Sequence, residues 1–173
     1  MRGIHHAGIV VSDLHRAIDF YTGVLGLELM TEPTPPASGE RLEKLLNLPG
    51  ARLHGGVLLR AGDSAVELHE FEAPEWTGPT PVPAHAIGSQ HVAFRCDDLP
   101  AEKAAIESRG GVFLTGIHLV DSGPFEGLKT AFLLDPDGIR IEFIEVAYWR
   151  QEDHRAGVAR YWAQREARTS SPG

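Results

Sequence analysis

The chain has 173 residues, of which 42% are hydrophobic, enough to form the core of one compact domain or of two small fused modules. Its 24 acidic and 16 basic residues give a formal net charge of −8, which argues against a nucleic-acid-binding protein. No apolar run is long enough to span a membrane and no signal peptide is recognisable, while the single cysteine, Cys96, excludes an internal disulfide bond. We therefore expect a cytoplasmic protein with no nucleic-acid or membrane partner.

The first predicted elements are a strand over residues 4–11 and a helix that follows it. Ser12 or Asp13 can cap this helix, because a side-chain oxygen at that position accepts a hydrogen bond from a free backbone N–H. Apolar residues at helical spacing give the helix one buried face, and Gly26 ends it. A Pro-rich turn and a short helix are predicted within 31–50, and strands are predicted over 56–60 and 65–71.

The pattern then begins again 85 positions later, since "HAGIVVSDL" at 6–14 aligns with "HVAFRCDDL" at 91–99. In the second copy a helix precedes strands over 129–134 and 139–146, which are joined by the turn "DPDG". Both copies end in Glu-x-x-Glu, at positions 67/70 and 142/145. The expected organisation is a first module over 1–72 with an insertion at 31–50, a Pro-rich linker over 73–88, a second module over 89–147, and a C-terminal helix and tail over 148–173.

Strand alternation predicts which of the paired histidines matters, because successive side chains point to opposite faces of a sheet. In the first strand the apolar set must pack under the helix, so that His6 points to the other face and His5 lies at the rim. The same pattern places His91 on the face away from the helix of the second module. In the closing strands, Glu67 and Glu142 fall on these same faces.

Each module thus offers one histidine and one carboxylate on the face away from its helix. If these faces meet, four groups converge: His6, Glu67, His91 and Glu142. Two carboxylates in a sheet cavity are costly unless a cation neutralises them, and two nitrogen with two oxygen donors suit Zn²⁺, Ni²⁺, Co²⁺, Mn²⁺ or Fe²⁺. The alternative is that all four are ordinary polar residues on solvated sheet faces, but the duplication favours a metal site.

At "HHAGIVVSDLHRAIDFYTGVLGLEL", "HVAFRCDDL" and "DPDGIRIEFIE", the chain resembles the vicinal oxygen chelate superfamily, especially glyoxalase I and methylmalonyl-CoA epimerase. The resemblance covers about residues 4–31 and 52–146 and implies an α+β fold of two βαβββ modules that form an incomplete barrel around a metal. The modules would pair either within one chain or across a homodimer. His6, Glu67, His91 and Glu142 match the four ligand positions of the glyoxalase I pattern.

This resemblance implies a metal-dependent isomerase, epimerase or lyase that moves a proton next to a carbonyl through an enediolate or enolate of a small hydroxycarbonyl substrate. Glu142 is then the first candidate for the base, and Glu67 is its candidate partner on the opposite side of the metal. Weaker candidates for substrate contact are His69, His54, Arg95, Lys129 and Arg140. Two alternatives stay open: an extradiol-type ring-cleaving dioxygenase, and a non-catalytic small-molecule-binding protein of the antibiotic-resistance type.

Overall fold

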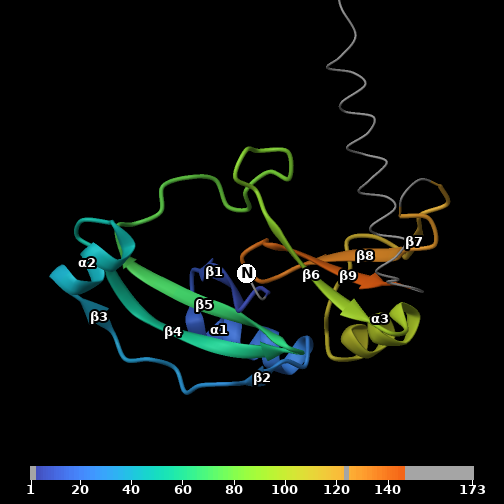
Figure 1. Cartoon of the computed structure of the whole chain (residues 1–173), viewed down its shortest axis with the longest axis horizontal. Coiled ribbons are helices and arrows are strands. Elements are labelled where there is room, and N and C mark those ends of the chain that lie inside the picture. The colour runs from blue at the N-terminus through green and yellow to red at the C-terminus, as the bar shows by residue number, and fades with distance from the viewer. Residues whose placement is uncertain (1–2, 123–124, 147–173) are drawn as a thin grey trace, which may run out of the picture.

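The computed structural model describes residues 3–122 and 125–146, which form two modules, each with its own sheet (Figure 1). The first module consists of the strands β1 (His6–Val11), β2 (Glu28–Leu29), β3 (Ala37–Ser38), β4 (Arg52–Ala61) and β5 (Ser64–Ala73), the helix α1 (Leu14–Asp19), which continues as the π-helix η1 (Phe20–Val24), and the helix α2 (Glu40–Leu46). The second consists of the strands β6 (His91–Cys96), β7 (His118–Leu119), β8 (Lys129–Leu134) and β9 (Arg140–Glu145) and the helix α3 (Leu99–Ser108).

The two sheets have the same topology. The strand order is β1-β5-β4-β2 in the first and β6-β9-β8-β7 in the second, with the first and last strands of each module parallel and the remaining pairs antiparallel. Strand β3 and helix α2 have no counterpart among the described residues of the second module, and they lie at the end of the first sheet remote from that module (Figure 1). The predicted α+β fold of two βαβββ modules is therefore confirmed.

Several predicted elements differ in extent from the observed ones. Strands β4 and β5 extend beyond the predicted 56–60 and 65–71, because the two strands pair over nearly their whole length. The predicted module and linker boundaries remain predictions, although residues 74–90 contain no helix or strand. The C-terminal helix predicted within 148–173 lies outside the described residues. Within the described ranges, no helix has the length and apolarity needed to cross a membrane.

Helix α1 begins at one of its two predicted caps, and α3 begins in the same way. Asp13 accepts a hydrogen bond from the backbone N–H of Arg16 at 2.9 Å, and Asp98 accepts one from Ala101 at 2.9 Å. Ser12, the alternative cap, instead contacts the second module. Gly26 follows η1 with a φ of 82°, a left-handed conformation that a residue without Cβ adopts at low cost.

A single hydrophobic core joins the two modules. Buried side chains of β1, α1 and η1 belong to the same cluster as those of α3, β8 and β9: Ile9, Val11, Leu14, Tyr21, Leu99, Ile106, Leu133 and Ile141 are members. Each fully buried aliphatic side chain contributes about 1.5–3 kcal/mol relative to exposure. Because these residues lie on the helix-facing sides of both sheets, the modules pack with those sides toward the shared core. The opposite faces, which carry His6 and His91, point away from it.

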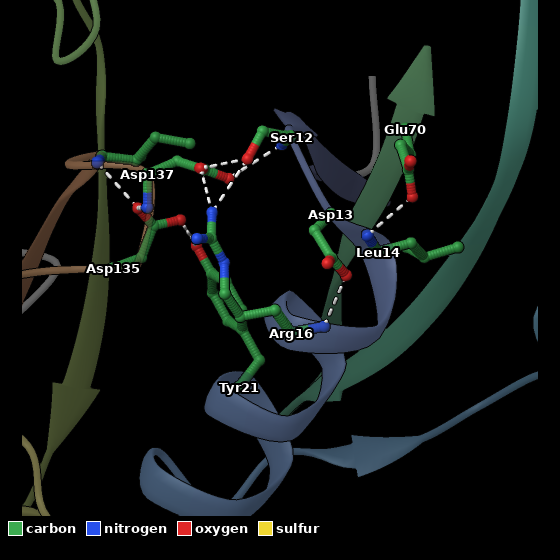
Figure 2. Close-up of polar contacts among 9 residues, drawn as sticks. Ser12, Asp13, Leu14, Arg16, Tyr21, Glu70, Asp135 and Asp137 are labelled. Atoms are coloured by element: carbon green, nitrogen blue, oxygen red, sulfur yellow. Dashed lines mark hydrogen bonds and ion pairs between the residues drawn. The ribbon is translucent and has the colours of Figure 1, made fainter. Parts of the chain in front are cut away.

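A polar junction fixes this arrangement (Figure 2). In the turn between β8 and β9, the Asp137 carboxylate accepts hydrogen bonds from the backbone N–H of Ser12 at 2.9 Å and from its hydroxyl at 2.6 Å, and it pairs with the Arg16 guanidinium at 2.5 Å. The neighbouring Asp135 accepts a hydrogen bond from the hydroxyl of Tyr21 at 3.1 Å. The N-terminal part of the first module is thus held to a turn of the second.

Candidate metal centre

The first half of the candidate site lies on the exposed face of β1 and β5. Nε2 of His6 lies 3.0 Å from Oε2 of Glu67, and Nε2 of His69 lies 3.0 Å from the same oxygen. The side chains of His6 and Glu67 are 39% and 28% exposed, so solvent and ligands reach both. His5, expected at the rim, contacts the other ring nitrogen of His6, with 2.7 Å between the two Nδ1 atoms. This contact can orient the His6 ring, as hydrogen-bonded partners orient the imidazoles of metal sites.

The second half lies on the corresponding face of β6 and β9. Nε2 of His91 is 3.1 Å from Oε2 of Glu142, whose side chain is only 13% exposed. The hydroxyl of Thr130 donates to the other oxygen of Glu142, Oε1, at 2.6 Å. The ring of Phe132 makes an edge contact with that of His91, with their centroids 5.9 Å apart.

Strand register explains why the two halves are alike. In both modules the glutamate on the last strand pairs with a small residue on the parallel first strand, Gly8 opposite Glu67 and Ala93 opposite Glu142. The histidine stands two residues before that small residue, on the same face of the strand. The imidazole therefore reaches the carboxylate diagonally, over a position without a large side chain.

Each half-site has donors that fit a divalent transition metal. An imidazole nitrogen and a carboxylate oxygen that face each other at 3.0–3.1 Å are the donor types that Zn²⁺, Fe²⁺, Co²⁺, Ni²⁺ and Mn²⁺ bind. The two halves do not meet within one chain, however. In the part of the chain that the structure describes, no group of three or more His, Cys, Asp or Glu residues is placed to hold a metal ion. The predicted convergence of four ligands is therefore not seen between the modules of a single chain.

The weaker candidates divide between the two faces. Arg95 and Arg140 share the face of His91 and Glu142, as their register requires, and His69 contacts Glu67 directly. In contrast, His54 and Lys129 lie on the helix-facing sides of their sheets, where each stands beside a glutamate that holds the start of a helix. Both side chains thus lie on the face opposite to that of His6 and His91, and substrate contact by His54 or Lys129 remains a prediction.

These two glutamates, Glu70 and Glu145, make the same contact in the two modules. Glu70 accepts a hydrogen bond from the backbone N–H of Leu14 at 2.8 Å, and Glu145 accepts one from Leu99 at 2.8 Å. Both bonds satisfy a free N–H at a helix start, where negative charge is favourable. The ammonium group of Lys129 lies 2.6 Å from Glu145, and this hydrogen bond, together with that from Leu99, lowers the pKa of the Glu145 carboxyl.

A hollow in the described surface lies elsewhere. It has a volume of about 430 Å³ and is lined by Leu14, His15, Pro33, Thr34, Pro36, His54 and Glu70, on the helix-facing side of the first sheet. None of the four predicted ligands lines it. Burial raises the pKa of the Cys96 thiol to about 11, and the thiol donates a hydrogen bond to the carbonyl oxygen of Ile144 at 3.6 Å, so that the neutral thiol is favoured.

Sequence reasoning missed Thr130 as a contact of the site. The signal was available, because the "DPDG" turn sets the register of the hairpin that it joins: Phe132 pairs with Glu142 and Thr130 with Ile144. This register places the Thr130 side chain on the face of Glu142. The contact between His5 and His6 had no comparable signal, since neighbouring residues of a regular strand point to opposite faces.

Comparison with known proteins agrees with this fold. The profile of the Glyoxalase/Bleomycin resistance protein/Dioxygenase superfamily matches residues 3–143. The chain is 32% identical to a lactoylglutathione lyase of Haemophilus influenzae over 82% of this chain and 91% of that protein. It is 27% identical to a 2-epi-5-epi-valiolone epimerase of an Actinomyces species over 83% of this chain and 79% of that protein.

Solved structures show the same architecture. A glyoxalase family protein from Enterococcus faecalis superposes with a TM-score of 0.60 at 25% identity, covering 83% of this chain and 98% of the other. A glyoxalase family protein from Bacillus cereus superposes with a TM-score of 0.65 at 21% identity, covering 84% and 94%, and this likeness concerns the fold alone. The duplicated modules, the matched profile and these relatives establish that the chain belongs to the Glyoxalase/Bleomycin resistance protein/Dioxygenase superfamily.

Proposed function

We propose that this protein is a divalent-metal-dependent isomerase, epimerase or lyase that transfers a proton next to the carbonyl of a small hydroxycarbonyl substrate. The observation that carries this proposal is the duplicated pair of imidazole and carboxylate, His6 with Glu67 and His91 with Glu142, at nearly equal distances in both modules. Relatives named as an epimerase and as lactoylglutathione lyases support this class of reaction.

A second copy of the chain would complete the site. Each half-site supplies one nitrogen and one oxygen donor, whereas four-coordinate sites need twice that number. Both half-sites lie on faces that point away from the shared core, and the side chain of His91 is 51% exposed. In a homodimer with two-fold symmetry, the first half-site of each copy faces the second half-site of the other, which yields two equivalent four-ligand centres.

In this proposal each residue of the site has its own role. His6, Glu67, His91 and Glu142 would hold a divalent cation, whose positive charge would stabilise negative charge on the carbonyl oxygen of the substrate. Glu142 removes the proton from the neighbouring carbon, and its low exposure keeps water away from the transferred proton. Glu67 returns a proton to the other face in an epimerisation. Arg95 and Arg140, on the same face as Glu142, are placed to bind polar groups of the substrate.

The deciding experiment follows incorporation of solvent deuterium at the carbon next to the carbonyl. Candidate substrates are 2-oxoaldehyde–thiol adducts, acyl-CoA epimers and epimerisable sugar-like ketones, among them 2-epi-5-epi-valiolone. We expect wash-in with one of these classes in the metal-loaded protein, its loss on treatment with a chelator, and its return when a divalent metal is added. Elemental analysis of the purified protein identifies the metal.

Replacing Glu142 with Gln tests the assigned base. The substitution keeps the shape of the side chain and removes its capacity to take a proton, so that wash-in should fall by at least about 100-fold while the circular dichroism spectrum is unchanged. The exposed His118 on β7 offers a matched control, and His118→Gln should keep full activity. Retained wash-in in Glu142→Gln would refute the role of Glu142. Uptake of oxygen with catechols would point to the dioxygenase instead, and purified protein free of metal would point to the binding protein.

A further inference from the structure

One cross-strand pair differs between the modules in a complementary way. In the first sheet, Gly56 on β4 pairs with His69 on β5, next to the pair formed by Leu58 and Glu67. In the second sheet, the corresponding pair is Thr130 on β8 with Ile144 on β9, next to Phe132 and Glu142. A polar side chain therefore stands on the last strand in one module and on the preceding strand in the other.

In the first module the imidazole of this pair holds the carboxylate. Nε2 of His69 lies 3.0 Å from Oε2 of Glu67, and a carboxylate only accepts hydrogen bonds, so that the imidazole donates. Gly56 makes the room: a Cβ at this position would stand 2.9 Å from Nδ1 of His69. The ring lies over the backbone of β4 because its strand partner has no side chain.

In the second module a hydroxyl on β8 donates the hydrogen bond to the carboxylate. Oγ1 of Thr130 donates to Oε1 of Glu142 at 2.6 Å, and the position that corresponds to His69 is occupied by Ile144, which has no polar group. The oxygens used also differ. His69 and His6 share Oε2 of Glu67, whereas Thr130 takes Oε1 of Glu142 and leaves Oε2 to His91.

We propose that His69 and Thr130 are positioning residues, each of which orients the metal-binding carboxylate of its module from one member of this cross-strand pair. The inference rests on the proposed function in that Glu67 and Glu142 are taken as metal ligands. A glutamate on a half-exposed sheet face has several rotamers, and a hydrogen bond from a rigid neighbour keeps it in the one that faces the imidazole ligand. Such partners of ligands commonly contribute 10–100-fold to metal affinity.

The first test measures Zn²⁺ affinity of the full chain by isothermal titration calorimetry. His69→Ile copies the residue of the second module, and Thr130→Val removes the hydroxyl with little change in shape. We expect each to weaken Zn²⁺ binding by roughly 10–100-fold with an unchanged urea midpoint. His69→Gln keeps a donor of similar reach and should restore most of the affinity. The exposed His118 again gives a control, and His118→Ile should bind as the wild type does.

A transplanted pair makes the test sharper. Gly56→Thr combined with His69→Ile reproduces in the first module the arrangement of the second, with a hydroxyl opposite an isoleucine. Once the His69 ring is gone, the nearest neighbour of the new Cβ is the carbonyl oxygen of Leu68 at 3.0 Å, which must shift by a few tenths of an ångström. The double variant should bind Zn²⁺ more tightly than His69→Ile alone. Equal affinity of His69→Ile and wild type would overturn the assignment of His69, and equal affinity of Thr130→Val and wild type would overturn that of Thr130.

A second measurement needs no metal. In the metal-free protein, ¹⁵N NMR of the histidine rings should show His69 protonated at Nε2, and this resonance should shift in Glu67→Leu, which removes the acceptor. An unshifted resonance would overturn the proposed contact whether or not the protein binds metal. Wild-type protein that binds no Zn²⁺ would instead refute the proposed function, with the NMR result still deciding the contact.

Discussion

The junction between the modules can be tested by removing one hydroxyl, in Tyr21→Phe. Tyr21 has no exposed surface, and its hydroxyl donates to Oδ2 of Asp135, which is itself 5% exposed. The other carboxylate oxygen, Oδ1, accepts the backbone N–H groups of Asp137 and Ile139 at 2.9 and 2.8 Å. Replacing Tyr21 with Phe therefore leaves the ring packed in the core and removes one of three donors to a buried carboxylate (Figure 2).

The magnitude follows from this geometry. A hydrogen bond to a charged group contributes about 1.5–3 kcal/mol, and no solvent replaces it at so buried a position. Because the ring itself stays, no cavity cost is added. A loss of about 2 kcal/mol lowers the melting temperature of a chain of this size by roughly 4–8 °C.

The loss should also depend on pH. Burial raises the pKa of Asp135, so its contribution to stability is greatest below the pKa of the unfolded chain and declines as the pH rises through the folded value. The hydrogen bond from Tyr21 opposes this rise by favouring the charged form. Without it the pKa of Asp135 rises further, and the destabilisation in Tyr21→Phe should be larger at pH 7 than near pH 4, where the folded-state carboxyl is more protonated.

Urea unfolding followed by far-UV circular dichroism at both pH values measures these differences. Asp135→Asn provides the matched background, because it removes the charge and should reduce the cost of Tyr21→Phe in a double-mutant cycle. A loss below about 0.5 kcal/mol at pH 7, or an equal loss at both pH values, would show that the Tyr21–Asp135 contact does not stabilise the junction as described.

Two further predictions concern the hydrogen bond of Glu145 to the start of α3 and the cross-strand pair of Gly56 with His69. Glu145→Gln should lower the urea midpoint at pH 7, because it weakens the hydrogen bond to the start of α3 and the ion pair with Lys129. The pKa of Glu145 is lowered in the folded state, so the wild type has this stabilisation above the pKa of the unfolded chain and loses it as the pH falls through the folded value. The urea midpoints of the two proteins should therefore converge in acid. Gly56→Ala should weaken Zn²⁺ binding in calorimetry without changing any donor, because its Cβ would displace the His69 ring.

Each of these predictions has a clear contrary result. A constant difference in urea midpoint between wild type and Glu145→Gln from pH 7 down to pH 3 would mean that the ionised carboxylate is not the stabilising species. Unchanged Zn²⁺ affinity in Gly56→Ala, with the His69 resonance also unmoved, would mean that the glycine is not what admits the ring. Gly8→Ala is a useful control for the second case, because a Cβ there meets no atom within 4 Å.

Sequence alone was sufficient for the modules and for the face on which each half-site lies. The match of residues 6–14 with 91–99 identified the repeat, and the period of two in a strand placed His6 with Glu67 and His91 with Glu142. These features are local, since they depend only on alternation along a strand and on the pairing of the first with the last strand of a module. The register of a hairpin such as that at 135–138 is local as well, which is why Thr130 could have been found.

What the tertiary structure decided is how the modules pack and what each polar side chain contacts. The contacts of Asp135 and Asp137 with Tyr21, Ser12 and Arg16 join residues more than 100 positions apart, and no periodicity in the chain encodes them. They turn the helix-facing sides inward, so the two half-sites point outward and do not meet in one chain. Likewise, only the fold shows that His54 and Lys129 each lie beside the glutamate at a helix start. Strand geometry repeats every two residues and is written in the sequence, whereas packing between modules depends on the shapes of two assembled surfaces.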